Sequence, residues 1–163
     1  MADQLELGPL VERLDHIAIG VNDLADTTAL LELVGATFRS GGDFLAGGFR
    51  WSQFDLPGSM KMELLQPLDP SDDQHFLVRF LASRGEGVHH MTFKVTDIDA
   101  AVARARSLGF EVVGVNTSSD SWKEAFVHPK SAHGVVVQMA QWEDGDPPDD
   151  RSFQGVIDGL YRF

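Results

Sequence analysis

Alternating apolar and polar positions predict short strands, and the same pattern of elements occurs twice along the chain. Apolar side chains recur at every second position in residues 14–21 and again in residues 88–95, the period of a strand with one buried face. A segment of helical character follows each strand and ends at a glycine, at 24–34 and at 97–108. The remaining strand-like runs are 38–44, 49–56, 60–66, 110–115, 123–128 and 134–141. The order strand, helix, three strands is therefore repeated.

The repeat singles out two histidines. At an offset of 74 residues, DHIAIGVNDL at 15–24 lies over HHMTFKVTDI at 89–98, which makes His16 and His90 equivalent. Neighbouring side chains of a strand point to opposite faces, so only one of the adjacent residues His89 and His90 can face a given site. The repeat selects His90.

Two paired βαβββ modules predict an α+β fold, a curved and partly open mixed sheet with helices on the outside. We expect equivalent positions to meet on the concave face, which brings together His16, Glu63, His90 and Gln138. Two imidazoles, a carboxylate and an amide oxygen suit a divalent cation of borderline or hard character. A lone histidine on a strand more often has a structural role, and the alternative for Glu63 is a surface ion pair with Lys61. The repeat favours the metal site.

The chain is expected to form one compact domain of two modules. Its predicted parts are an N-terminal arm at 1–10, a first module at 11–68, a linker and connecting helix at 69–87, a second module at 88–142 and an acidic, proline-rich tail at 143–163. Ser71 with Gln74, and Thr96 with Asp99, are the predicted helix caps. The small residues beside His16 in the first strand predict a roomy surface there.

Composition and charge narrow the classes of partner. The formal net charge of −12 argues against nucleic acid, because a phosphate backbone would be repelled. No segment reaches the roughly 20 apolar residues of a membrane span, and we expect a cytoplasmic protein without a membrane partner. The absence of cysteine excludes disulfides and thiolate metal ligands. An anionic substrate would need a local positive site, from a metal or from Lys123 and Lys130.

The sequence resembles the vicinal oxygen chelate superfamily, and within it the methylmalonyl-CoA epimerase branch. Three segments carry the resemblance: LDHIAIGVNDL at 14–24, RGEGVHHMTFKVTDIDAAV at 84–102 and FVHPKSAHGVVVQM at 126–139. It implies a homodimer, a small-molecule substrate, possibly an acyl-CoA, and one divalent metal ion, which could be Co, Mn, Ni, Zn, Mg or Fe. The metal positions of the family fall on the four residues that the repeat brings together.

The resemblance implies an isomerase or epimerase that removes the proton α to a thioester or ketone. Such epimerases usually carry a glutamate in the last strand, where this chain has Gln138. An amide can coordinate a metal but cannot accept a proton, so Glu63 is the candidate catalytic base. The alternatives are a glyoxalase-like isomerase or lyase acting on a small oxo or hydroxy compound, an Fe(II) oxygenase, and a ligand-sequestering protein of the antibiotic-resistance type.

Overall fold

The computed structural model describes residues 10–145 and 150–163. The arm predicted at 1–10 lies outside the described residues except for its last position, as does the stretch 146–149 of the predicted acidic tail.

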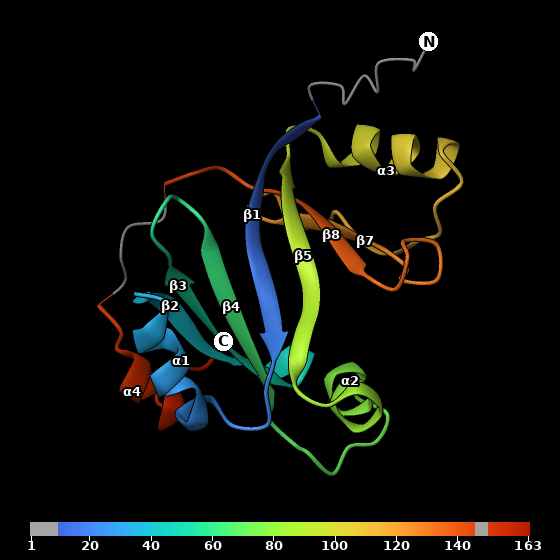
Figure 1. The fold of residues 1–163 in the computed structure, drawn as a ribbon. Helices are drawn as coiled ribbons and strands as arrows, with labels where there is room; N and C mark the ends of the chain where they lie inside the picture. The colour runs from blue at the N-terminus through green and yellow to red at the C-terminus, as the bar shows by residue number, and fades with distance from the viewer. Residues whose placement is uncertain (1–9, 146–149) are drawn as a thin grey trace. The chain divides into compact units, whose positions relative to one another are not determined.

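The described chain contains the predicted order of elements twice. The first set is β1 (Val11–Gly20), the 3-10 helix η1 (Leu24–Thr27) running into α1 (Thr28–Leu33), β2 (Thr37–Phe44), η2 (Leu45–Gly47), β3 (Phe49–Asp55) and β4 (Lys61–Pro67). The second set is β5 (Gly87–Val95), α3 (Ile98–Ser107), β6 (Val112–Asn116), β7 (Lys123–Val127) and β8 (Val136–Gln141). Two further helices are α2 (Phe76–Arg84) and α4 (Phe153–Ile157). The α+β fold of two βαβββ modules with a mixed sheet is confirmed (Figure 1).

The chain packs into two compact units. Among the described residues, the β5–β8 unit comprises residues 10–15 and 90–144, and the β2–β4 unit comprises residues 16–89, 145 and 150–163. The strands β1 and β5 each begin in one unit and end in the other. The division into linear modules at 11–68 and 88–142 stays a prediction.

In the β2–β4 unit the strand order is β2-β3-β4-β1. β1 runs parallel to β4, and the other neighbours are antiparallel. One face of this sheet packs against α1 and α4 (Figure 1), and its buried apolar residues are Val21, Leu24, Leu31, Phe54, Leu64 and Val156. Alternation along the strands explains this layer, because it turns the apolar row of β1 and β4 toward the helices.

Helix α2 packs on the opposite face of the same unit. Leu77 of α2 is fully buried against Ala18 and Leu65. A Cβ atom built on Gly20 would lie 3.0 Å from the Phe80 ring and 3.1 Å from Leu77. The expectation of a roomy surface beside His16 was therefore wrong at this end of β1: the small residues let α2 approach the strand.

In the β5–β8 unit the strand order is β5-β8-β7-β6, with the first half of β1 beside β5. Thr96 N–H donates to the Leu10 carbonyl oxygen (2.9 Å), where β1 and β5 run antiparallel. Helix α3 covers one face, and the buried residues of that layer are Val95, Ile98, Ala101, Val102, Ala105, Ala125, Val127 and Met139. The opposite face carries His90 and the side chains in phase with it along β5.

The caps of two helices differ from the sequence-based expectation. Asp97, rather than Thr96, caps α3, because its carboxylate reaches the Ala100 N–H (3.0 Å). Helix α2 begins at Phe76, and the ring of His75 caps it by accepting from Leu77 N–H (3.3 Å). Ser71 instead donates to Asp69 in the preceding turn (2.6 Å).

The C-terminal segment docks on the edge strand β2, which its apolar residues alone did not indicate. Tyr161 O accepts from Asp43 N–H (2.8 Å), and Phe163 N–H donates to Asp43 O (2.9 Å). Arg50 joins this region to the sheet: its guanidinium donates to the buried Asp43 carboxylate (2.6 Å) and to Ile157 O (2.6 Å).

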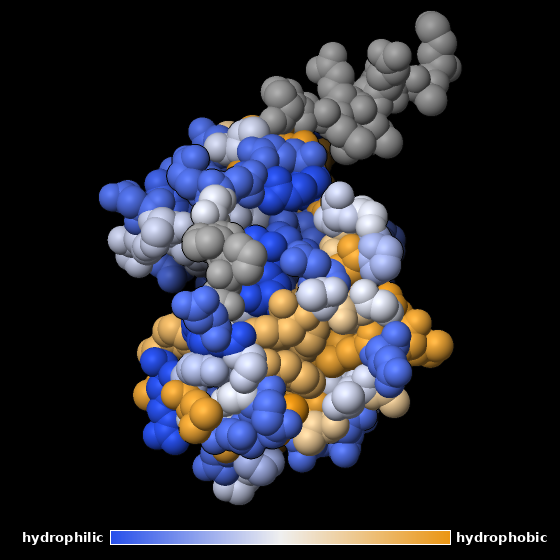
Figure 2. Space-filling view, turned by 90° about the vertical axis from the view of Figure 1, so that its left-hand side faces the viewer, coloured by the Kyte–Doolittle hydropathy of each residue, from blue (hydrophilic) through white to orange (hydrophobic). Residues whose placement is uncertain are grey.

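The described residues contain no helix that is long and apolar enough to cross a membrane. Hydrophobic side chains do reach the surface on the face drawn in Figure 2. The large exposed ones of the β2–β4 unit include Phe44, Leu45, Phe76 and Leu160. Singly exposed hydrophobic residues are ordinary on a protein surface, and the homodimer implied by the resemblance stays a prediction.

Replacing Arg50 with methionine should leave the carboxylate of Asp43 buried without its main cation, at a cost of about 3 kcal/mol in the free energy of unfolding. The matched control is Arg39→Met, which removes a more exposed pair with Asp55 (29% and 48% side-chain exposure) and should cost less than about 1 kcal/mol. Urea denaturation measures both. Equal, small losses would show that Arg50 does not hold the C-terminal segment.

Candidate metal centre

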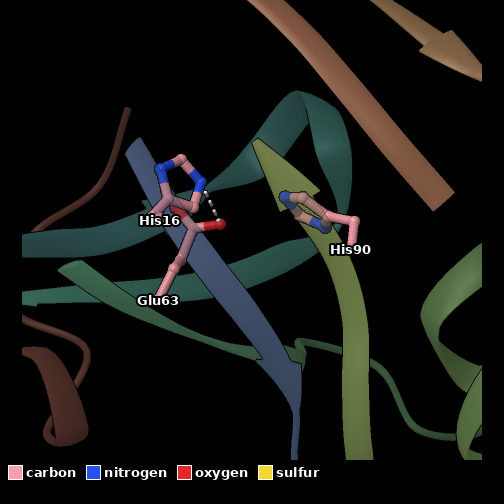
Figure 3. A group of neighbouring side chains, drawn as sticks. All are labelled: His16, Glu63 and His90. Carbon is pink, nitrogen blue, oxygen red and sulfur yellow. Dashed lines mark ion pairs between the residues drawn. The ribbon is translucent and has the colours of Figure 1, made fainter. Parts of the chain in front are cut away.

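His16 and Glu63 lie on neighbouring parallel strands and contact each other. In the parallel pairing of β1 with β4, Glu63 is opposite Ala18. His16 lies two residues before Ala18 on β1, so its side chain points to the same face of the sheet. His16 Nε2 lies 3.5 Å from Glu63 Oε2 (Figure 3), and the side chains are 3% and 15% exposed.

His90 reaches the same place from β5. Glu12 of β1 and Lys94 of β5 form an ion pair (3.1 Å), as expected of opposite residues on antiparallel strands. One ligand atom each of His16, Glu63 and His90 lies within 4.8 Å of the others (Figure 3). Three of the four predicted side chains are thus brought together.

The geometry of this group fits a divalent ion. With bonds of about 2.1 Å, two ligand atoms of one ion stand roughly 3 Å apart when adjacent and at most about 4.2 Å apart when opposite. The 3.5 Å between His16 and Glu63 and the upper limit of 4.8 Å for the group need only small side-chain adjustments. The histidines are 3% and 6% exposed and rise from strands, which limits their motion.

Gln138 lies in the β5–β8 unit, hydrogen-bonded on both sides. In the parallel pairing of β5 with β8, Gln138 is opposite Thr92. Thr92 lies two residues after His90 on β5, so the side chains of His90, Thr92 and Gln138 share one face of the sheet. Thr92 Oγ1 donates to Gln138 Oε1 (2.5 Å), and Gln138 Nε2 donates to Glu124 Oε2 (2.7 Å). Coordination of a metal by Gln138 stays a prediction.

Glu124 makes a contact with Gln138 that sequence reasoning missed. It lies on β7, and its Oε2 also accepts from Trp122 Nε1 (3.0 Å). Phe126 is opposite Gln138 in the pairing of β7 with β8. Glu124 lies two residues before Phe126, so by alternation its side chain is on the same face as that of Gln138. Only the pairing of β7 with β8 shows that the carboxylate meets the amide.

The two lysines predicted to contact substrate lie apart from these hydrogen bonds. Lys123 is opposite Gln141 at the start of β7, where alternation sends its side chain to the face away from Glu124. Lys130 is exposed in the turn after Pro129. Their substrate contacts stay predictions.

Lys94 is the cationic residue on the His90 face of β5, and its charge is already balanced by carboxylates. Its side chain is 7% exposed and pairs with Glu12 (3.1 Å) and Asp144 (2.8 Å). Its Nζ also lies 5.3 Å from the centroid of the Trp142 ring. Burial alone would lower the pKa of Lys94, but hydrogen bonds to the two carboxylates outweigh it and raise that pKa.

Asp144 receives hydrogen bonds from two cations. Arg13 donates to it at 2.8 Å and Lys94 at 2.8 Å. The pKa of Asp144 is held well below its usual range, first by the Arg13 bond and then by the Lys94 bond. The carboxylate is therefore ionised at neutral pH and ties β1, β5 and the segment after β8 together within the β5–β8 unit.

Comparison with known sequences assigns the family. The profile of the Glyoxalase/Bleomycin resistance protein/Dioxygenase superfamily matches residues 15–126. The chain belongs to this superfamily. A glyoxalase-superfamily relative from Cereibacter sphaeroides, an ethylmalonyl-CoA/methylmalonyl-CoA epimerase, is 32% identical over 137 residues, which cover 81% of this chain and 99% of that protein. The mitochondrial methylmalonyl-CoA epimerase of Homo sapiens is 33% identical, over 79% of this chain and 73% of that protein.

Solved structures of the superfamily agree with the sequence matches. The crystal structure of methylmalonyl-CoA epimerase from Mycobacterium tuberculosis has a TM-score of 0.72 and 27% identity, covering 88% of this chain and 94% of that one. The resemblance noted from the sequence, to the superfamily and within it to the methylmalonyl-CoA epimerases, is therefore confirmed.

Replacing Asp144 with asparagine should destabilise the fold by no more than about 1 kcal/mol at neutral pH, because its carboxylate is 59% exposed. The pKa of Asp144 is lower in the fold than in the unfolded chain, so its contribution is present above an unfolded value of about 3.9 and is lost as the pH falls further. Urea denaturation from pH 7 to pH 3 should show a constant difference above about pH 5 that shrinks below about pH 4. Asp120→Asn, at an exposed position, is the control, and a difference that grows on acidification would contradict the assignment.

Proposed function

We propose that this protein is a divalent-metal-dependent isomerase that removes the proton α to the carbonyl of an acyl thioester. The observation that carries this proposal is the group of His16, Glu63 and His90, which combines two imidazole nitrogen donors with a carboxylate on strands. Similarity to methylmalonyl-CoA epimerases supports a malonyl-type acyl-CoA as the substrate class.

His16, Glu63 and His90 would hold the metal, with Gln138 as a fourth oxygen donor. A divalent ion bound there acts as a Lewis acid that stabilises the negative charge on the thioester oxygen when the α-proton leaves. The set of imidazole and oxygen donors suits Co, Ni, Zn, Mn or Fe better than Mg, which prefers oxygen alone.

Glu63 is the residue proposed to accept the α-proton. In this step the C–H bond breaks, the proton passes to a Glu63 oxygen, and the electron pair is delocalised onto the thioester oxygen. The side chain is 15% exposed, which leaves one edge of the carboxylate accessible while most of it is shielded from water. Donation of a proton from a water molecule to the opposite face of the carbanion, with loss of the Glu63 proton to solvent, would complete an epimerisation.

A second candidate reaction is favoured by Gln138. Among the described residues the metal group holds one carboxylate, that of Glu63, and the amide of Gln138 cannot take part in proton transfer. A reaction that needs one base, such as a glyoxalase-like isomerisation or a lyase reaction on a small oxo or hydroxy compound, would use the same residues. A ligand-sequestering protein is less well supported, since it would not need these donors. Both enzyme candidates are consistent with a cytoplasmic protein.

Metal binding should depend on the two equivalent histidines. His16→Ala or His90→Ala should weaken Co²⁺ binding at least 100-fold, because each removes a nitrogen ligand from a buried group. His133→Asn, at an exposed turn position, should bind as the wild type does. Titration of the metal-stripped protein with Co²⁺, followed by its visible absorption, measures all three. Wild-type affinity in either alanine variant would remove that histidine from the site.

Exchange of solvent deuterium into methylmalonyl-CoA tests the reaction. The Co²⁺-loaded protein should exchange the α-proton, and Glu63→Gln should lose at least 100-fold in rate while still binding metal, because its amide keeps an oxygen donor but cannot accept a proton. Chirality of the product then separates epimerisation from a reaction at one face. Absence of exchange with Co²⁺, Mn²⁺, Ni²⁺ or Zn²⁺ would overturn the acyl thioester proposal and favour the second candidate.

A further inference from the structure

A chain of hydrogen bonds crosses three strands of the β5–β8 unit. It runs from Thr92 on β5 to Gln138 on β8 and on to Glu124 on β7, with bonds of 2.5 and 2.7 Å. Thr92 is fully buried and Gln138 is 6% exposed. Trp122 Nε1 adds a second donor to the same Glu124 oxygen (3.0 Å). The carboxylate is thus fixed from two sides.

We propose that Glu124 is a positioning residue that sets the orientation of the Gln138 amide and makes it an oxygen donor toward the metal; this rests on the proposed function. An ionised carboxylate can only accept hydrogen bonds, so the NH₂ group of Gln138 must face Glu124. The amide oxygen is then turned toward β5, the strand that carries His90. Without the carboxylate, the two ends of the amide could exchange places.

The chemistry of the amide oxygen allows it to bind a cation. A carbonyl oxygen has two lone pairs, and the hydroxyl of Thr92 uses one of them. The second can bind a metal ion. Gln138 would in this way act as a neutral ligand whose direction is set by a negative charge one strand further out, an arrangement that tunes many metal sites.

The same contact explains why an amide rather than a carboxylate suits position 138. A glutamate there would place its oxygen where Gln138 Nε2 now lies, 2.7 Å from Glu124 Oε2. Two carboxylates at that distance cannot both be ionised without a large electrostatic cost. Glu124 and Gln138 therefore form a matched pair, and changing one alone should disturb both.

Co²⁺ titration of the metal-stripped protein tests the positioning role through a double-mutant cycle. Glu124→Ala and Gln138→Ala should each weaken Co²⁺ binding about 10-fold, the lower end of the range for such outer-shell partners. The double variant should bind Co²⁺ with the same affinity as the single variant that binds it less tightly, because both changes remove the same oxygen ligand. Loss of that ligand should also change the intensity of the Co²⁺ visible bands equally in all three variants. Glu143→Ala, which removes an exposed charge, is the matched control.

Glu124→Gln separates orientation from charge. Its amide keeps an oxygen that can accept from Gln138 Nε2, so it should retain affinity within about 3-fold of the wild type. A loss as large as that of Glu124→Ala would mean that Glu124 acts only through its charge, which overturns the positioning role. Purely additive losses in the double-mutant cycle would also overturn it.

A test that needs no metal exchanges the two side chains, so that position 138 carries glutamate and position 124 carries glutamine. Gln138→Glu alone should lower the urea midpoint of the metal-stripped protein at pH 8, and adding Glu124→Gln should restore it, because the hydrogen bond then returns with donor and acceptor exchanged. No rescue in the double variant would contradict the matched pair.

If His16→Ala abolishes Co²⁺ binding while the Glu124 and Gln138 variants bind as the wild type does, only the positioning role fails. If the wild type binds no Co²⁺, the positioning role and the metal-dependent function both fail.

Discussion

The alternation of side chains along β1 is the constraint on which the rest of the structure depends. One face of this strand supplies Ile19 to the core under α1 and α4, followed just beyond the strand by Val21, and the other face presents His16 toward Glu63. A slip of one residue in the pairing with β4 would bury the imidazole in the apolar layer and turn the isoleucine outward. The hydrophobic core therefore fixes the register, and the register fixes the position of the first histidine.

The repeat made much of this predictable from the sequence. Equivalent positions in two similar modules indicated His16 and His90 without any knowledge of their distance, and alternation excluded His89. His89 indeed lies against the rings of Phe76 and Phe80 of α2 (5.4 and 4.9 Å between centroids). Burial there lowers its pKa, which fits an imidazole packed among aromatic rings.

Other features depend on contacts that no local pattern records. The C-terminal segment is apolar enough to dock, but its place on β2 follows from the bond of Asp43 to Arg50 and from backbone pairing with Tyr161. Likewise, Glu124 looked like an ordinary strand residue, and its hydrogen bond with Gln138 follows from the register of β7 with β8. The caps Asp97 and His75 were missed for a related reason, because several residues near a helix start can accept from its first N–H groups and the backbone path decides among them.

Local charge limits the ways in which this acidic protein can meet an anionic substrate. The net charge is −12, and the buried cation on the His90 face, Lys94, already has two carboxylate partners. A metal at the histidine pair would therefore be the main positive charge at the proposed site, so it would serve both to attract the substrate and to stabilise the carbanion. A second negative ligand in place of Gln138 would reduce that charge. If Gln138 is a ligand as proposed, its amide would add no negative charge to the metal, and the carboxylate that would orient it, Glu124, would lie one hydrogen bond away (2.7 Å).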